Sequence, residues 1–395
     1  MPTNKSRKQR ANSIIEKRRK KADVEIQFNW IFVLIAGALI LTLFVSIAVK
    51  QKNIARDRLV AEVIDKLTTI LAGAQTTEGS AGYISVPDLS YTFKCELDTC
   101  NGYACASHLS TEGTKTGMSY AINPIFSPDL IRGNLMGTWT QDWNMPFGVT
   151  NFLYITAPNV RYVIVSPGDS SVYAKLAEEV YTTMPETITD QTIQKEIKII
   201  TKELVTSNQE IKPKAYYKTK IVNFASSLPL AADKFKNTEL VVIDVTLITG
   251  GPGGIIDGYG ELIFREYKKS RPSELKKSYY FTKPGLFAAI FAEDYENYEC
   301  NMKKAMYRLR IVSEVYEKRT QKISEFLSQP GHTNDCIIPN KYPQAQQSFA
   351  AIKAAIKDYE DPNNREVAIN KILIAQSELV DYNNKLMGAS CPLIY

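Results

Sequence analysis

The chain has 395 residues, 44% hydrophobic and 23% charged, a composition that excludes wholesale disorder and collagen-like repeats. Its length allows roughly two or three domains. The formal net charge of +6 lies entirely in residues 1–27, which hold nine of the 48 Lys and Arg residues and three of the 42 Asp and Glu residues. Residues 28–395 are therefore neutral, so we expect no nucleic-acid partner for the folded part.

Residues 28–49, FNWIFVLIAGALILTLFVSIAV, form an apolar run without a charge. A helix of this length spans the ~30 Å hydrocarbon core of a bilayer, at ~1.5 Å per residue. Trp30 at one boundary and Lys50 and Lys52 at the other are the expected interface anchors. We predict a single transmembrane helix.

Lys and Arg are denser before the apolar run than after it. The positive-inside rule therefore predicts a basic cytoplasmic tail over residues 1–27, in contact with anionic lipid, and a large C-terminal domain outside the cell membrane. The alternative is a cleaved secretory signal, because Ser46-Ile47-Ala48 matches the small-x-small cleavage pattern.

The helical period continues over residues 50–78, where apolar residues recur at spacings of three and four. We predict an amphipathic continuation of the membrane helix that ends between Gly73 and Gly79. This architecture is similar to that of type IV pilins, and Lys20-Lys21-Ala22 resembles the processing site of archaeal pilins. Asp23 and Glu25 depart from the pilin pattern, which is mostly apolar there.

Six cysteines follow the apolar run, and an even number on the outer side indicates disulfides. Three lie early and three late, so complete pairing needs at least one bond between the two groups. We expect Cys300 to pair with Cys391, and Cys336 with the early group, because one straight helix over 286–329 would keep Cys300 from Cys336. Their spacing does not match a zinc site, so we expect no metal. The six are Cys95, Cys100, Cys105, Cys300, Cys336 and Cys391.

Residues 80–284 are predicted to form an outer domain that begins β-rich and becomes α/β. Trp139 and Trp143 are expected in its core. We expect a hairpin of strands 152–156 and 161–165, then a Rossmann-like layered sheet with an antiparallel edge. The glycine-rich segment 250–254 is expected to be a hairpin loop. The further strands are predicted at 83–86, 91–95, 103–108, 118–122, 220–224, 240–247 and 260–265, and the helices at 172–184 and 191–206.

The loop after strand 161–165 is the candidate ligand-binding segment. A strand–loop–helix junction aims backbone N–H groups at the mouth of a sheet, where ligands settle. The same residues also fit a plain helix cap, and Asp169 opposes an anion. The candidate residues are Ser166, Gly168, Asp169, Ser170 and Ser171.

Residues 285–395 are predicted to form a C-terminal helical hairpin. Apolar residues over 295–326 repeat at spacings of three and four, which is a heptad pattern. We expect this stripe to pack within the chain, and a self-associating coiled coil is the alternative.

The stretch 125–156, IFSPDLIRGNLMGTWTQDWNMPFGVTNFLYIT, runs into APNVRYVIVSP. Together with QFNWIFVLIAGALIL at the apolar run and CPLIY at 391–395, it resembles uncharacterised single-pass membrane proteins of small-genome (DPANN-type) archaea. The resemblance implies an archaeal surface protein with an exported domain and transfers no functional residue.

The sequence as a whole predicts an α+β fold on an N-terminal transmembrane helix. The expected function is a membrane-anchored cell-envelope protein that acts as a structural or partner-binding module. The alternatives are a ligand-binding sensor or a pilin-like subunit of a surface filament or secretion apparatus. We expect no enzyme and no cofactor, since the chain has only two histidines, His108 and His332, and no G-x-S-x-G motif.

Overall fold

In the computed structural model the chain is a mixture of helix and sheet, 52% helical and 34% strand, with an N-terminal apolar helix, as predicted for the α+β class. It divides into two compact units, Met1–Val63 and Ile64–Tyr395, which are taken separately below. The structure describes residues 5–77, 79–101, 104–111, 117–119, 124–187, 197–201, 217–225, 228, 239–251, 254–268, 271–272, 274–329, 336 and 341–395.

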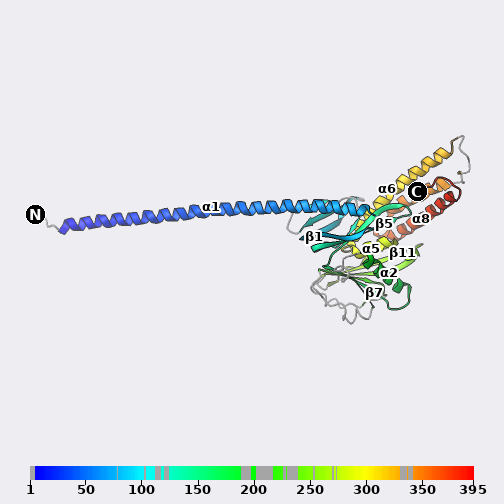
Figure 1. The fold of residues 1–395 in the computed structure, drawn as a ribbon, viewed down its shortest axis with the longest axis horizontal. Coiled ribbons are helices and arrows are strands. Elements are labelled where there is room, and N and C mark those ends of the chain that lie inside the picture. The colour runs from blue at the N-terminus through cyan, green and yellow to red at the C-terminus, as the bar shows by residue number, and fades with distance from the viewer. Residues whose placement is uncertain are drawn as a thin grey trace. The chain divides into compact units, whose positions relative to one another are not determined.

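Helix α1, Lys5–Thr76, is one continuous helix (Figure 1). It begins well before the predicted span because residues 5–27 hold no Pro or Gly and are rich in Lys, Arg and other good helix formers. The segment from Trp30 is long and apolar enough to cross a membrane, by length and composition. Its hydroxyls are satisfied within the helix: Thr42 donates to the Ala38 carbonyl at 2.6 Å, and Ser46 to the Thr42 carbonyl at 2.7 Å. Internal satisfaction is what a bilayer interior requires.

The last part of α1, from Ile64, belongs to the second unit and packs within it. Ile64, Leu67 and Leu71 are buried at helical spacing. Gln75 is 6% exposed, and its Nε2 donates to the Pro124 carbonyl at 3.1 Å. The Gln75 carbonyl accepts from Asn151 Nδ2 at 2.7 Å. The predicted amphipathic continuation therefore ends as a packed helix.

The first sheet has six strands in the order β3-β2-β1-β5-β6-β4. Its pairs are antiparallel except for the parallel pair β4 and β6. Trp139 and Trp143 of β5 are buried, as predicted, and Trp143 stacks on Phe152 at 5.3 Å. The strands are β1 Ala81–Asn101, β2 Ala104–Thr111, β3 Gly117–Ser119, β4 Ile125–Phe126, β5 Leu130–Asn144 and β6 Gly148–Thr156.

The second sheet has parallel strands and an antiparallel edge. Strands β8, β7, β9 and β10 are parallel neighbours in that order, and β11 is antiparallel to β10, β12 and β13. Helix α2, Val172–Thr187, connects β7 to β8. The strands are β7 Val160–Ser166, β8 Ile197–Thr201, β9 Lys218–Asn223, β10 Glu239–Gly251, β11 Gly254–Lys268, β12 Arg271–Pro272 and β13 Lys276–Phe281.

Two expectations for this region are wrong. Segments 152–156 and 161–165 do not form a hairpin, because β6 pairs with β5 and β4 in the first sheet, whereas β7 pairs with β8 and β9 in the second. Both are continuous buried runs, which is typical of central strands and carries no information about the partner. The helix predicted at 191–206 is replaced at Ile197–Thr201 by strand β8, and its other residues lie outside the described part.

Helix α5, Thr282–Phe291, contacts strands of both sheets and lies between them (Figure 1). Every residue from Pro284 to Phe291 is buried. The single helix expected over 286–329 is wrong, because α5 ends at Phe291 and a second helix begins at Tyr295. The break follows from Asp294, whose carboxylate accepts from the Asn297 amide at 2.9 Å and caps α6, Tyr295–Leu327.

The C-terminal region holds three neighbouring helices. Helix α7, Lys341–Asp358, contacts both α6 and α8, Arg365–Gly388, with a short 3₁₀ turn at Pro362–Asn364 before α8. The first half of the predicted heptad stripe is buried in the chain's own core. These buried residues are Tyr298, Met302, Ala305 and Leu309.

Candidate ligand-binding cleft

The second sheet has a topological switch point between β7 and β9. The chain leaves β7 through α2 to reach β8 on one side, and then continues to β9 on the other side of β7. In open α/β sheets, ligands bind outside the carboxyl ends of the strands at such a point.

A cleft of about 890 Å³ lies at these strand ends. Its size is in the range of small-molecule sites. The loop after β7, the segment after β9, and strands β10 and β11 each supply part of its wall. The lining residues are Pro167, Asp169, Ser171, Tyr173, Phe224, Ala225, Leu228, Asp244, Val245, Thr246, Ile263, Arg265 and Leu275.

The predicted loop reaches the cleft with two of its five candidate residues, Asp169 and Ser171. Asp169 Oδ1 accepts from the Ser171 amide at 3.0 Å, and Ser171 Oγ accepts from the Ala174 amide at 3.3 Å, which caps α2. Gly168 has a φ of 79°, a left-handed conformation that suits glycine. Ser166 Oγ accepts from the Gly168 amide at 3.4 Å, so Ser166 and Gly168 shape the turn.

Sequence reasoning missed a polar network on the opposite wall. Asp244 of β10 accepts from Asn223 Nδ2 at 2.6 Å and from Arg265 Nη2 at 2.7 Å. Arg265 Nε is buried and has no partner among the described residues. One signal was present: Asp244 is the only charged residue in the apolar run 240–247.

The charges of the cleft are unfavourable to anions. Hydrogen bonds from Ser171 lower the pKa of Asp169, so this carboxylate is ionised at neutral pH. Arg265 is the cation among the lining residues, and Asp244 already pairs with it. The remaining walls are largely apolar, and Leu275 is 62% exposed. The cleft therefore fits an uncharged or cationic molecule with an apolar part.

A second charged cluster lies near the amino ends of the same strands. Lys218 forms ion pairs with Glu293 and with Glu239, the latter at 3.4 Å, while Lys220 Nζ donates to the Ile290 carbonyl at 3.3 Å. Burial and the neighbouring Lys218 hold the pKa of Lys220 well below its usual value. Both lysines lie at the carboxyl end of α5, where free carbonyls favour donors. This cluster thus joins the second sheet to α5.

The cysteines form three disulfides, and complete pairing does include a bond between the early and late groups. The expected partners are wrong: the bonds are Cys95–Cys300, Cys100–Cys105 and Cys336–Cys391. Helix α6 contacts β1 and β2, and this contact brings Cys300, in the second turn of α6, to Cys95. Helix length alone could not show this contact.

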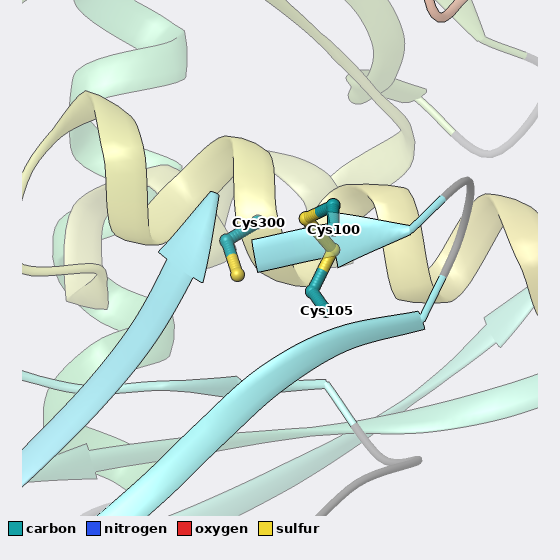
Figure 2. A group of neighbouring side chains, drawn as sticks. All are labelled: Cys100, Cys105 and Cys300. Atoms are coloured by element: carbon teal, nitrogen blue, oxygen red, sulfur yellow. A yellow bond between two sulfur atoms is a disulfide. The ribbon is translucent and has the colours of Figure 1, made fainter. Parts of the chain in front are cut away.

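Two of these disulfides are adjacent. The Sγ atoms of Cys100, Cys105 and Cys300 all lie within 4.8 Å of one another (Figure 2). His108 lies on β2 in the first sheet, and His332 lies outside the described residues. No protein-family model, curated protein or solved structure matches this chain.

Proposed function

We propose that this protein is a membrane-anchored binding module of the cell envelope, and that its cleft holds a small uncharged or cationic molecule. The supporting observation is the 890 Å³ cleft at the switch point of the second sheet. The site combines apolar walls with a few convergent polar groups, as small-molecule sites do. This proposal develops the sensor alternative in preference to a purely structural role.

The proposed placement is a cytoplasmic N-terminus and a folded region outside the cell membrane. The basic residues before Phe28 support this orientation. Three disulfides support an oxidising compartment for the folded region. An archaeal cell surface follows from the resemblance described above.

The test is ligand-dependent stabilisation of the full chain in detergent. A panel of neutral, cationic and anionic metabolites is added, and the melting temperature is recorded. A compound at 100 times its Kd raises the free energy of unfolding by about 2.7 kcal/mol. We expect hits among neutral or cationic compounds. Hits confined to nucleotides and other polyanions would contradict the proposed chemistry.

A matched pair of variants localises the effect. Thr246→Trp fills the cleft from an exposed position of β10 and is expected to abolish stabilisation by the hit compound. Thr249→Trp, exposed on the same strand but not part of the lining, is the control and should keep it. Equal loss in both variants would show that the compound binds elsewhere.

A further inference from the structure

Four sulfur atoms from three elements meet at one place in the fold. We refer to Cys95, Cys100, Cys105 and Cys300 as the four-sulfur cluster. Cys95 and Cys100 come from β1, Cys105 from β2 and Cys300 from the first turns of α6. The Cys300 sulfur, which is bonded to Cys95, lies within 4.8 Å of both sulfurs of the Cys100–Cys105 bond (Figure 2).

Each of the two bonds joins a partly exposed residue to a buried one. Cys105 is 2% exposed and Cys300 is fully buried, whereas their partners Cys100 and Cys95 are both partly exposed. A thiol from solution therefore has access to each bond, at Cys100 and at Cys95. The Cys100–Cys105 bond also closes a sequence separation of only 5 residues, against 205 for Cys95–Cys300. Closure of a short loop contributes less stability, so the hairpin bond is the easier one to open.

A buried polar chain ends on Cys95. Ser107, opposite Cys95 on β2, donates from its hydroxyl to Cys95 Sγ at 3.2 Å. Lys304 Nζ in turn donates to Ser107 Oγ, and Lys304 is only 2% exposed. Burial lowers the pKa of Lys304 to about 8. A donor chain that begins at an ammonium group stabilises a thiolate on Cys95.

We propose that the four-sulfur cluster is a thiol–disulfide exchange site, which accepts a small dithiol at Cys100 and passes its electrons to the Cys95–Cys300 bond. In the first step a thiolate of the dithiol attacks Cys100 Sγ. A bond forms between these two sulfurs, the Cys100–Cys105 bond breaks, and its electron pair leaves on Cys105. The Cys105 thiolate then faces Cys300.

In the second step Cys105 attacks Cys300. The Cys105–Cys300 bond forms, the Cys95–Cys300 bond breaks, and the electron pair leaves on Cys95 beside Ser107. In the third step the second thiol of the dithiol attacks the first sulfur of the same dithiol, which is bonded to Cys100. This releases Cys100 as a thiolate and the reagent as a cyclic disulfide. The protein gains two electrons, and solvent protons neutralise Cys95 and Cys100.

The reaction moves the covalent link of α6 from β1 to β2, because Cys105 replaces Cys95 as the partner of Cys300. It leaves two thiols, Cys95 and Cys100, on the partly exposed side of the cluster. These thiols are placed to reduce a second disulfide substrate and restore the starting state. The third disulfide, Cys336–Cys391, takes no part.

The test follows the sulfurs of the full chain in detergent during limited reduction. Dithiothreitol is added at a limiting concentration, N-ethylmaleimide stops the reaction, and peptide mass mapping finds the blocked thiols. The expected first product carries the label on Cys95 and Cys100 and contains a Cys105–Cys300 bond. Label on Cys100 with Cys105, or on Cys95 with Cys300, would overturn the proposal.

Variants test the order of the steps. The pair Cys100→Ser and Cys105→Ser is expected to slow opening of Cys95–Cys300 by about tenfold or more, because the relay sulfur is lost. The control pair, Cys336→Ser and Cys391→Ser, should leave that rate within about twofold. Equal rates in the two variants would overturn the relay.

Lys304→Gln addresses the role of the donor chain. We expect slower transfer to Cys95 below pH 8 and an unchanged rate of opening at Cys336–Cys391, which reports on folding in the same molecule. Transfer at the parent rate, with Cys336–Cys391 also unchanged, would remove Lys304 from the proposal. Faster opening of both disulfides would show that Lys304→Gln unfolds the protein. In that case Ser107→Ala is the test variant, and we expect it to slow transfer to Cys95. Transfer at the rate of the unmodified protein in Ser107→Ala would contradict a role for the Lys304–Ser107 donor chain.

Discussion

The buried carboxyl of Asp129 makes the stability of this fold depend on pH. Its amide donates to Glu293 Oε2 at 2.8 Å, and it lines a small cavity of about 110 Å³ with Lys218 and Asp294. Burial, with a contribution from the like charge of Asp294, raises the pKa of Asp129 to about 6. The folded state therefore binds a proton between about pH 4 and pH 6 that the unfolded chain, with an ordinary pKa near 3.9, has released.

This difference in pKa between the folded and unfolded states decides whether the free energy of unfolding rises or falls with pH. The folded state binds more protons in that window, so the contribution of Asp129 to stability falls as pH rises through it. Asp129→Asn keeps the shape and removes the charge. We expect no change in the free energy of unfolding at pH 4 and a gain on the order of 2 kcal/mol at pH 7, since each tenfold difference in proton affinity is worth about 1.4 kcal/mol.

Urea unfolding at both pH values measures this difference. Glu360→Gln, at an exposed position, is the control and should change stability by less than about 0.5 kcal/mol at either pH. Destabilisation by Asp129→Asn at pH 7 would mean that attraction to Lys218 outweighs the cost of burial.

At the scale of elements, α5 is the centre of the folded unit. It is apolar on every side, which is the pattern of a helix with no solvent face. Phe287 packs edge-to-face on Trp139 with ring centroids 4.7 Å apart, and Phe291 stacks on Tyr154 at 5.3 Å. From the other sheet, Tyr162 approaches Phe291 at 5.3 Å. Both sheets thus depend on one short helix.

Phe287→Ala should therefore cost about 3–5 kcal/mol, the range for a large aromatic truncated in a tight core. Thermal and urea unfolding of the full chain in detergent measure the loss. Phe326→Ala on α6 is the matched control, because Phe326 is 54% exposed, and it should cost less than about 1 kcal/mol. Similar losses at both positions would mean that α5 is not the centre of stability.

The parallel core of the second sheet was predictable from the sequence. Segment 240–247 is a nearly continuous apolar run, as expected of a strand buried on both faces. The break between α5 and α6 was not predictable, because an apolar helix followed by a heptad stripe has the pattern of one continuous helix. Its signal was Asp294, a capping residue hidden within that period.

Only the loop side of the cleft was predictable from the sequence. The loop at Ser166–Ser171 follows from a strand–helix junction, which is local in sequence. The contact of Asp244 with Asn223 and Arg265 depends on the register of β9, β10 and β11. Register is set by long-range pairing, and a single sequence does not display it.

At the scale of the whole molecule, helix α1 carries a segment that is long and apolar enough to cross a membrane. Its apolar side chains between Trp30 and Val49 are exposed, and Leu39 near the middle of this run is 67% exposed. An exposed apolar surface of this kind fits the proposed membrane anchor. A charge at its centre opposes insertion by about 2.5–3.5 kcal/mol.

Leu39→Arg is therefore expected to shift the protein out of the carbonate-resistant membrane fraction, as measured by fractionation and immunoblotting. Ile54→Arg, beyond the apolar run, is the control and should remain in that fraction. Protease added to intact cells tests the orientation: loss of residues 50–395 with survival of the N-terminal tail is expected. Full protection would reverse the proposed topology, and an N-terminus beginning after Ala48 would replace the anchor with a cleaved signal.

The position of α5 also bears on how the protein matures. Ribosomes make the chain from its N-terminus, so both sheets are synthesised before the helix that covers their inner faces. Until Phe291 has emerged, two apolar sheet faces lack their shared cover. Nascent chains in this condition are prone to aggregate, and large mixed folds commonly pass through such intermediates. A protein built in this way needs protection during synthesis, which the release of α5 brings to an end.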